Sequence, residues 1–252
     1  MILSITNQKG GVAKTTTSNN LAFAFRSKGI SVLLIDMDGQ GNLSNINQAD
    51  TTQRTIYDVM TKECKAEDAI QTVEGVDIIP GDTRLFVIDT KLNELTKYFA
   101  LKDALKDIKS KYDIIIIDTA PGFETTTINA LIASDKVIIP ATASMFALQG
   151  IANVYKNVEN IKQHFNSELT IDGILLTLAE QHLQQHQDAE ETIQHVAKQI
   201  NVDIYKTRIR KNTTVAKAND ARQNIFAFNA KSNGASDYLK LANELLERGI
   251  LK

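Results

Sequence analysis

Cysteine, proline and tryptophan are scarce in this chain of 252 residues, which contains one cysteine, three prolines and no tryptophan. The single thiol, Cys64, cannot form an internal disulfide, which excludes a disulfide-stabilised scaffold and fits a reducing compartment. No Gly/Ser-rich linker divides the sequence. Since this length also lies within the range of one large α/β domain, we expect a single domain over residues 1–252.

Long apolar runs are absent as well. Runs such as Ile114–Ile117 are far too short to cross a bilayer, which takes roughly 20 residues. The first residues, Met1–Thr6, have the pattern of a strand and lack the basic region and cleavage site of a secretory signal. We therefore expect a cytoplasmic protein without a membrane anchor. The formal net charge of −2 gives no overall sign of nucleic-acid binding.

Short apolar, β-branched runs alternate with longer amphipathic stretches along the chain. This alternation is typical of a doubly wound α/β fold, in which helices cover both faces of a mostly parallel sheet. Several of the runs are apolar at every position, as strands buried on both faces are. Strands are expected at Ile2–Thr6, Ser31–Asp36, Val76–Ile79, Ile114–Asp118, Lys136–Pro140, Ile171–Thr177 and Val202–Tyr205. Helices are expected at Lys14–Lys28, Asp89–Lys109, Thr125–Ser134, Ala147–His164, Gln185–Gln199 and Ser236–Arg248.

The segment between the first strand and the first helix, Asn7–Thr16, has the composition of a phosphate-binding loop. Glycines let successive backbone N–H groups converge on phosphate oxygens, and the helix that follows adds the positive end of its dipole. In such a loop Lys14 reaches the β- and γ-phosphates and the Thr15 hydroxyl ligates Mg²⁺. The strict pattern G-x-x-x-x-G-K-[ST] fails, because Gln8 and Ala13 stand at its two glycine positions. The candidate nucleotide-binding residues are Lys9, Gly10, Gly11, Val12, Ala13, Lys14, Thr15 and Thr16.

Two of the expected strands end in aspartates. The first ends at Asp36 and is followed by Asp38; we expect it beside the strand that precedes the phosphate loop, with its acid in the crevice where such sheets bind ligands. The second is a run of four isoleucines that ends at Asp118, which is typical of a Walker B strand holding Mg²⁺. Together with Lys14, these acids indicate phosphoanhydride hydrolysis by positioning and charge neutralisation, without a nucleophilic side chain.

These segments resemble two motifs of the ParA/MinD superfamily of deviant P-loop ATPases. Lys9-Gly10-Gly11 and Lys14 match the loop K-G-G-x-G-K-[ST], with Ala13 at the third glycine position. The sequence Asp36–Asn42 matches the motif D-x-D-P-Q-G-N, with Gly39 at the proline position. The resemblance implies that ATP and Mg²⁺ are the ligands.

The resemblance also implies roles for the candidate residues. Lys9 stands at the position of a signature lysine that crosses the interface of an ATP-dependent homodimer and contacts the nucleotide of the partner subunit. Asp38 corresponds to the residue that positions the attacking water, so the implied catalytic residues are Asp38, Lys9 and Lys14. The implied metal residues are Thr15, Asp36 and Asp118.

Further segments resemble the ParA partition proteins more closely than the superfamily in general. They are Thr55–Met60, Ile138–Pro140, Phe146–Gly150 and Asp237–Leu246. No helix-turn-helix pattern precedes the ATPase motifs, which is typical of the short form of the family. The resemblance implies an ATP-controlled DNA segregation ATPase that binds nonspecific double-stranded DNA, associates with the nucleoid and is stimulated by a ParB-like centromere-binding protein. The expected helix that begins at Ala147 is a candidate docking face for that partner.

One segment is strongly basic although the whole chain is not. Residues 205–231 contain seven basic residues and one acid, Asp220, a local charge of +6. Such an asymmetry is expected of a surface that binds a phosphate backbone without reading base sequence. The candidate DNA-binding residues are Arg208, Arg210, Lys211, Lys217, Arg222 and Lys231.

Two other functions stay open at this point. One is a membrane-bound positioning ATPase similar to MinD, with the last helix as its membrane-targeting segment; the mixed charge of Lys240, Glu244, Glu247 and Arg248 on that helix favours packing on the core instead. The other is a biosynthetic enzyme that resembles dethiobiotin synthetase and acts on a small molecule.

Overall fold

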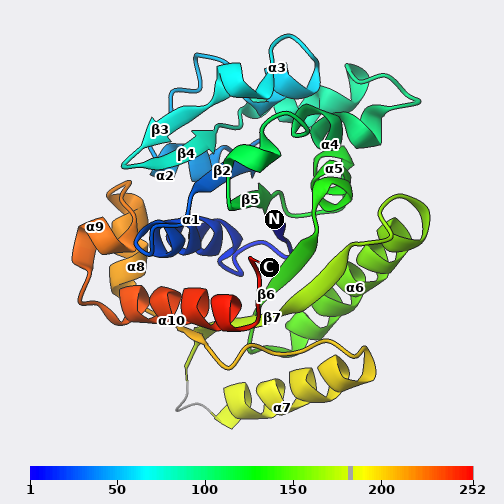
Figure 1. Ribbon diagram of the computed structural model, residues 1–252. Coiled ribbons are helices and arrows are strands. Elements are labelled where there is room, and N and C mark those ends of the chain that lie inside the picture. The colour runs from blue at the N-terminus through cyan, green and yellow to red at the C-terminus, as the bar shows by residue number, and fades with distance from the viewer. Residues whose placement is uncertain (181–183, 252) are drawn as a thin grey trace.

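The computed structural model describes residues 1–180 and 184–251, except for the side chains of residues 145–146 and 184–187. The stretch 181–183 therefore lies outside the described residues, as does the side chain of Phe146 in one of the motifs above. The described part contains an eight-stranded sheet with the order β3-β4-β2-β5-β1-β6-β7-β8 (Figure 1). Neighbouring strands are parallel except for β3 and β4, which are antiparallel. The strands are β1 (Ile2–Ile5), β2 (Val32–Met37), β3 (Gln71–Val73), β4 (Val76–Ile79), β5 (Ile114–Thr119), β6 (Lys136–Thr142), β7 (Thr170–Ala179) and β8 (Ile209–Arg210).

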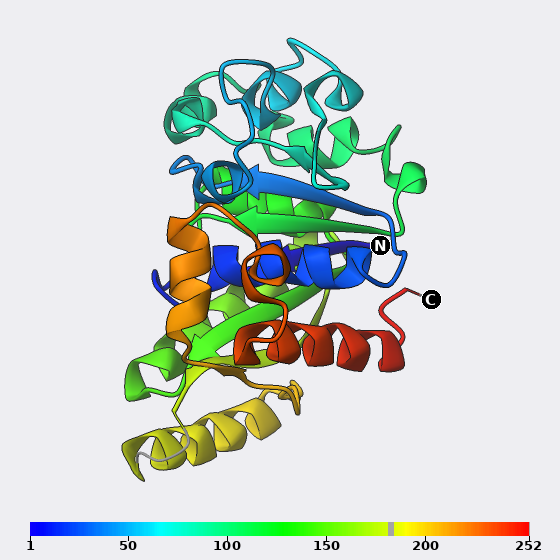
Figure 2. The same cartoon turned by 90° about the vertical axis from the view of Figure 1, so that its left-hand side faces the viewer.

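Helices cover both faces of this sheet, which confirms the predicted doubly wound α/β class (Figures 1 and 2). On one face lie α1, α8, α9 and α10, and on the other lie α3 to α7. The helices are α1 (Lys14–Arg26), α2 (Asn42–Ile46), α3 (Ile56–Met60), α4 (Ala100–Ala104), α5 (Thr125–Ala133), α6 (Met145–His164), α7 (Gln184–Gln199), α8 (Thr213–Asp220), α9 (Ile225–Asn229) and α10 (Asn233–Glu247). Short 3₁₀ segments include η2 (Thr83–Thr90) and η3 (Lys97–Phe99).

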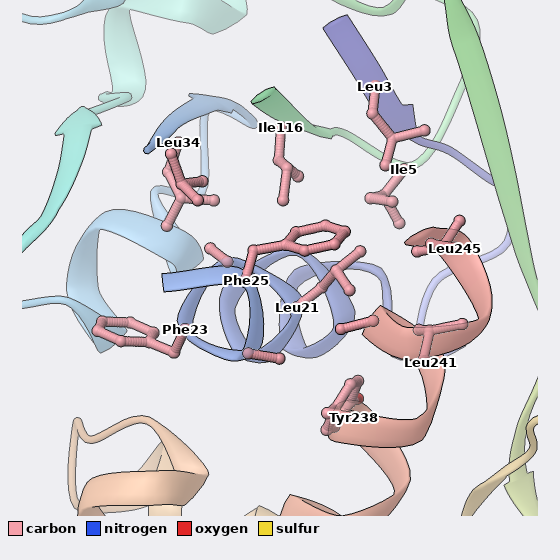
Figure 3. Close-up of a cluster of buried hydrophobic side chains, with 14 of the residues drawn as sticks. Leu3, Ile5, Leu21, Phe23, Phe25, Leu34, Ile116, Tyr238, Leu241 and Leu245 are labelled. Atoms are coloured by element: carbon pink, nitrogen blue, oxygen red, sulfur yellow. The ribbon is translucent and has the colours of Figure 1, made fainter. Parts of the chain in front are cut away.

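The core has two layers because successive side chains of a strand point to opposite faces. In β2, Leu34 packs with α1 and α10, whereas Leu33 packs with the helices of the other face. Figure 3 shows the first layer, in which Phe25 of α1 lies beneath Leu34 and Ile116, with α10 beside it. Strands β2 and β5 are buried at every position, which accounts for the four consecutive apolar residues with which each of them begins.

The order of the strands corrects one expectation. We expected the strand ending at Asp36 to lie beside β1, but β5 separates them and pairs with both neighbours. The connection through α1 therefore passes over β5 to reach β2. Because Asp118 is in register with Ile5 on one side and with Asp36 on the other, Asp118 takes the central position among the strand ends.

Two predicted elements were wrong in extent. The expected helix Asp89–Lys109 is broken: the range holds the end of η2, then η3 and α4, and a 3₁₀ turn, Lys109–Lys111, begins at its last residue. The side-chain oxygen of Asn93 accepts a hydrogen bond from the Leu95 amide at 2.9 Å, and this local turn competes with a helix. The other is the strand Val202–Tyr205, which is reduced to an isolated bridge at Ile204. After this bridge, the chain is drawn towards α10, because the Glu244 carboxylate accepts hydrogen bonds from the amides of residues 206 and 207.

Among the strands and α-helices that the structure describes, β3, β8, α2, α8 and α9 were not predicted. Each is short, with between two and eight residues, so its apolar period is too brief to stand out in the sequence. In the part of the chain that the structure describes, no helix has both the length and the apolar composition needed to cross a membrane.

Candidate nucleotide-binding site

The loop between β1 and α1 is anchored by Asn7. Its side-chain oxygen accepts a hydrogen bond from the Lys9 amide at 3.0 Å, and its side-chain nitrogen donates to the Pro140 carbonyl on β6 at 2.8 Å. Gly11 has a φ of 73°, which side chains disfavour. A Cβ placed on Gly10 or Gly11 would meet no atom within 4 Å, so the surface above the loop is open to a ligand.

Ala13, which stands at a glycine position of the strict pattern, has a backbone conformation that glycine adopts most readily. Its φ of 62° is in the left-handed region, which costs a non-glycine residue roughly 1–2 kcal/mol. Its carbonyl accepts a hydrogen bond from the Thr17 amide at 2.9 Å, so α1 begins directly after it. Alanine at this position of the motif therefore carries backbone strain that glycine would avoid.

Lys14 is buried at the start of α1, with 7% of its surface exposed. Its Nζ donates a hydrogen bond to the carbonyl oxygen of Lys9 at 3.2 Å. Burial lowers the pKa of Lys14, while Asp118 and Asp38 act against that shift. The ammonium thus lies among the groups that the sequence predicts at the site. Lys9 is half-buried, and the proposed contact of its side chain with a second subunit stays a prediction.

The two strand-end aspartates, Asp36 and Asp118, are completely buried. Burial, and then the charge of Asp36, raise the pKa of Asp118 to about 7. Burial also raises the pKa of Asp36 to about 6, against hydrogen bonds from Ser44 and Asp38. The charge of Lys14 offsets only part of the cost of ionising these two buried carboxylates, which favours a site that gains a further positive charge in function.

Two serines that were not predicted from the sequence donate hydrogen bonds to these acids. Ser18, one turn after Lys14 on α1, donates its hydroxyl to Oδ1 of Asp118 at 2.9 Å. Ser44 donates both its amide and its hydroxyl to Oδ2 of Asp36, at 2.9 and 2.7 Å. Both serines are visible in the sequence at fixed offsets from the motifs, but nothing in their identity marks them as partners of an acid.

The donor set fits a magnesium ion. The Oδ2 atom of Asp118 is buried and has no hydrogen-bond partner in the described part of the chain. The Thr15 hydroxyl lies near enough to lower the pKa of Asp118. A carboxylate oxygen together with a hydroxyl is a typical partial ligand set for Mg²⁺, which completes its shell with water and phosphate oxygens. Thr15 and Asp118 would hold the ion, and Asp36 would support the site from behind.

Asp38 lies in a turn at the edge of the site and is 5% exposed. Its Oδ1 accepts a hydrogen bond from the Gln40 amide at 2.9 Å, and its carbonyl accepts one from the Gly41 amide at 2.9 Å. Its own amide donates to Oδ1 of Asp36 at 3.1 Å. The structure therefore brings Lys14, Asp36, Asp38 and Asp118 together at the carboxyl ends of β1, β2 and β5, as the motifs predict.

A second set of missed residues links the site to α8 and α9. Asn219 of α8 donates to the Thr16 hydroxyl at 3.1 Å, and the amide of Ile225 donates to the side-chain oxygen of Asn20 on α1 at 2.8 Å. Gln48 donates to the carbonyl of Arg222 at 3.1 Å. The segment that follows the nucleotide loop is thus bonded directly to the basic region.

The structure separates the basic candidates into two groups. Three of them form ion pairs: Arg208 with Glu190 at 2.7 Å, Arg210 with Asp237 at 2.6 Å and Lys211 with Glu180 at 3.1 Å. The other three are exposed, and none of them forms an ion pair with any residue that the structure describes; they are Lys217, Arg222 and Lys231. The second group lies along α8, α9 and the turns beside them, at one side of α1 and α10 (Figure 2).

Comparisons with known proteins bear on the whole chain. A family model described as an AAA domain matches residues 1–171. The sporulation initiation inhibitor protein Soj of Bacillus subtilis is 37% identical, over 98% of this chain and 99% of that protein. The chromosome partitioning protein ParA of Caulobacter vibrioides is 34% identical, over 98% of this chain and 94% of its own length.

A solved structure is similar over almost the same range. It is the cobyrinic acid a,c-diamide synthase of Mycobacterium smegmatis with a bound ATP analogue and magnesium, with a TM-score of 0.86 and 27% identity. The match covers 98% of this chain and 94% of that one.

Proposed function

The chain belongs to the ParA-type family of Walker ATPases, and from this premise we propose that it is a DNA-segregation ATPase with a single ATPase domain over residues 1–252. It binds ATP and Mg²⁺, dimerises, holds nonspecific double-stranded DNA at the nucleoid in the cytoplasm, and releases the DNA on hydrolysis. The observation that carries the proposal is the meeting of Lys14, Asp38 and Asp118 at three neighbouring strand ends, where Oδ2 of Asp118 has no hydrogen-bond partner among the described residues.

Each residue has a task that its surroundings support. The backbone of residues 10–16 and the Lys14 ammonium bind the phosphates of ATP, and Thr15 and Asp118 hold Mg²⁺, which neutralises charge that develops on the phosphates. Asp38, whose carboxylate is fixed by the turn that follows it, orients the attacking water. Lys9 contacts the nucleotide of the second subunit.

DNA binding is proposed for the exposed basic residues on and around α8 and α9. Lys217, Arg222 and Lys231 carry charge that no described acid neutralises, so they contribute most to phosphate binding. The hydrogen bonds from Asn219 to Thr16 and from the Ile225 amide to Asn20 connect this segment to α1, the helix that begins at the nucleotide loop. Dimerisation joins two such surfaces, and avidity then makes DNA binding depend on ATP.

The partner is a ParB-like centromere-binding protein, and α6 is proposed as its docking face. Asn153 of α6 donates to the side-chain oxygen of Gln8 at 2.9 Å, which connects the helix to the nucleotide loop. The side chains of Ala152, Lys156 and Asn160 on the same helix are exposed. A partner bound to α6 can thus affect the nucleotide loop through the hydrogen bond between Asn153 and Gln8.

The apolar face of the last helix argues against a membrane role. Tyr238, Leu241 and Leu245 of α10 are fully buried against α1 and the sheet (Figure 3). Insertion of this face into lipid would remove it from the core. A small-molecule synthase remains the second candidate, because of the similarity to the cobyrinic acid a,c-diamide synthase structure.

The test is Mg²⁺-dependent ATP hydrolysis together with ATP-dependent dimerisation in analytical ultracentrifugation. We expect the wild type to do both and Lys14→Ala to do neither, while Lys28→Ala, which changes an exposed lysine beyond the end of α1, behaves as the wild type. A Lys14→Ala variant that hydrolyses ATP at the wild-type rate would contradict the proposed site.

A further inference from the structure

An exposed aromatic ring covers the turn that carries Asp38. Phe86, on η2, keeps 56% of its surface exposed, yet its ring lies directly over Gly39. A Cβ added to Gly39 would come within 2.9 Å of two ring carbons and 3.0 Å of a third. Real Cβ atoms do not approach other atoms so closely, so the ring fills the space that a side chain at position 39 would need.

Gly39, the residue under the ring, is one of the two central residues of the turn from Asp38 to Gly41. Asp38 and Gly41 are joined across it by the hydrogen bond from the Gly41 amide to the Asp38 carbonyl, and Gly39 lies between them. Glycine has the widest backbone freedom of any residue, so a turn with glycine there is loose unless something packs on it. Proline, which stands at this position in the motif that the segment resembles, restricts the backbone through its own ring. In this chain the ring of Phe86 packs on the same position.

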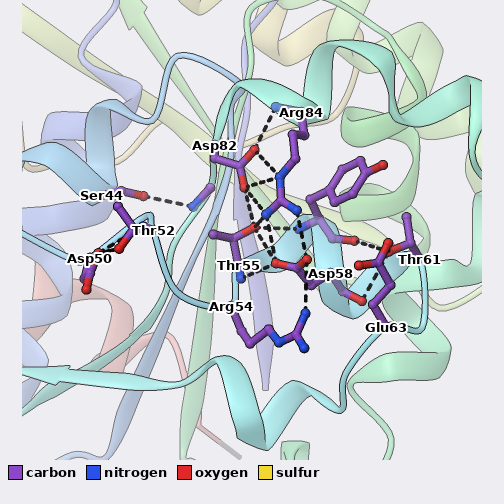
Figure 4. A network of polar contacts seen from close by, with 12 residues as sticks. Ser44, Asp50, Thr52, Arg54, Thr55, Asp58, Thr61, Glu63, Asp82 and Arg84 are labelled. Atoms are coloured by element: carbon purple, nitrogen blue, oxygen red, sulfur yellow. Dashed lines mark hydrogen bonds and ion pairs between the residues drawn. The ribbon is translucent and has the colours of Figure 1, made fainter.

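The segment that carries Phe86 is itself firmly held. Leu85 and Ile88 on either side of it are buried in the core. The Arg84 guanidinium donates hydrogen bonds to the carboxylates of Asp58 and Asp82 (Figure 4). Just before η2, the Gly81 amide donates to the Ser44 hydroxyl at 2.9 Å, the same hydroxyl that donates to Asp36. A rigid support therefore presents the ring to the turn.

We infer that Phe86 is a positioning residue for ATP hydrolysis, because its ring packs on Gly39 and restricts the turn that presents Asp38 to the attacking water. The inference rests on the proposed function. Phe86 does not touch the reacting atoms; it acts through the backbone of residues 38–41. Misplacement of a catalytic group by about 1 Å costs up to about 100-fold in rate, so a loosened turn lowers the rate of hydrolysis more than the binding of ATP.

The kinetic test compares Phe86→Ala with Val87→Ala. Val87 is the matched control, because it is the next residue, is 53% exposed and does not lie over Gly39. We expect Phe86→Ala to lower kcat by about tenfold with KM for ATP within twofold of wild type. Val87→Ala stays within twofold in both, and Phe86→Leu recovers part of the loss. Equal effects of the two alanine variants, or an unchanged kcat in Phe86→Ala, would overturn the inference.

A second measurement tests the packing of Phe86 on Gly39 without relying on ATP hydrolysis. Gly39→Ala introduces the methyl group that clashes with the ring, and we expect it to lower Tm; in the Phe86→Ala background the same change costs much less, because the clash is gone. Additive Tm shifts would show that the ring does not pack on the turn and would overturn the inference. Absence of Mg²⁺-dependent hydrolysis in the wild type would contradict the proposed function instead, and the Tm comparison would still decide whether the contact exists.

Discussion

Arg84 bridges two acidic side chains, and its removal should measurably lower the stability of the fold. Its guanidinium donates to both oxygens of Asp58, at 2.9 and 2.8 Å, and to Asp82 at 2.8 Å. The Asp58 side chain is 2% exposed and that of Asp82 is 12% exposed. The change Arg84→Met keeps an aliphatic side chain but removes the cation that contacts both carboxylates, and leaves Asp58 with only the more distant Arg54. Removing one partner of a buried ion pair is strongly destabilising, since the other charge stays buried.

The size of the effect follows from burial. A fully buried pair loses about 3–5 kcal/mol when one partner is removed. The Arg84 side chain is 42% exposed, so water can replace part of what it supplies, and we expect a loss of about 2–3 kcal/mol in the free energy of unfolding at pH 7. Arg54→Met is the matched control. Arg54 lies 3.7 Å from Asp58 and is 53% exposed, so its removal costs less than about 0.5 kcal/mol.

The pH dependence of this loss has a definite sign. Burial would raise the pKa of Asp58, but hydrogen bonds from Arg84 and Thr55 outweigh it and lower that pKa below its ordinary 3.8. The pKa of Asp82 is lowered in the same way. A carboxyl group whose pKa is lower in the folded than in the unfolded protein stabilises the fold at any pH above its unfolded pKa. That stabilisation is lost as the pH falls through its folded pKa. We therefore expect the difference in the free energy of unfolding between wild type and Arg84→Met, measured by urea unfolding from pH 7 to pH 3.5, to shrink below about pH 4. A difference in the free energy of unfolding below about 0.5 kcal/mol at pH 7, or one of equal size at pH 7 and pH 3.5, would contradict the role assigned to Arg84.

Three other predictions follow from the site and the basic segment. Lys9→Ala retains ATP binding but loses the ATP-dependent dimer and DNA binding; normal DNA binding by this variant would contradict the role in the partner subunit. Because the pKa of Asp118 is raised to about 7, its ionisation destabilises the nucleotide-free protein as the pH rises from about 4 to 7. In EDTA, urea unfolding should find Asp118→Asn more stable than wild type by about 2–4 kcal/mol at pH 8, with little difference near pH 4. The double variant Lys217→Glu/Arg222→Glu weakens DNA binding at least tenfold in fluorescence anisotropy, whereas Lys211→Glu, which changes a lysine already paired with an acid, has a smaller effect.

The strand-end motifs were predictable because they follow from a general property of parallel sheets. A glycine-containing loop before a helix and an acid after an apolar run must meet at the carboxyl edge, whatever the order of the strands. The order itself was not predictable from local sequence, since nothing in the runs ending at Asp36 and Asp118 says which of them lies beside β1.

Contacts between distant segments were also invisible in the sequence. The acids that pair with Arg208 and Arg210 stand 18 and 27 residues away, so the basic segment looked more uniformly charged than it is. The packing of Phe86 on Gly39 likewise joins two loops with no shared pattern. Within the expected helix Asp89–Lys109, the side chain of Asn93 accepts a hydrogen bond from the Leu95 amide, and such a local bond competes with helix formation.

The most direct test of the central claim is binding to random-sequence duplex DNA, measured across a salt series with ATP, with ADP and without nucleotide. We expect tight binding only in the presence of ATP and Mg²⁺, and we expect it to weaken steeply as the salt concentration rises, since the contacts are to phosphates. Equal binding in all three nucleotide states, or none in any of them, would contradict an ATP-controlled DNA switch.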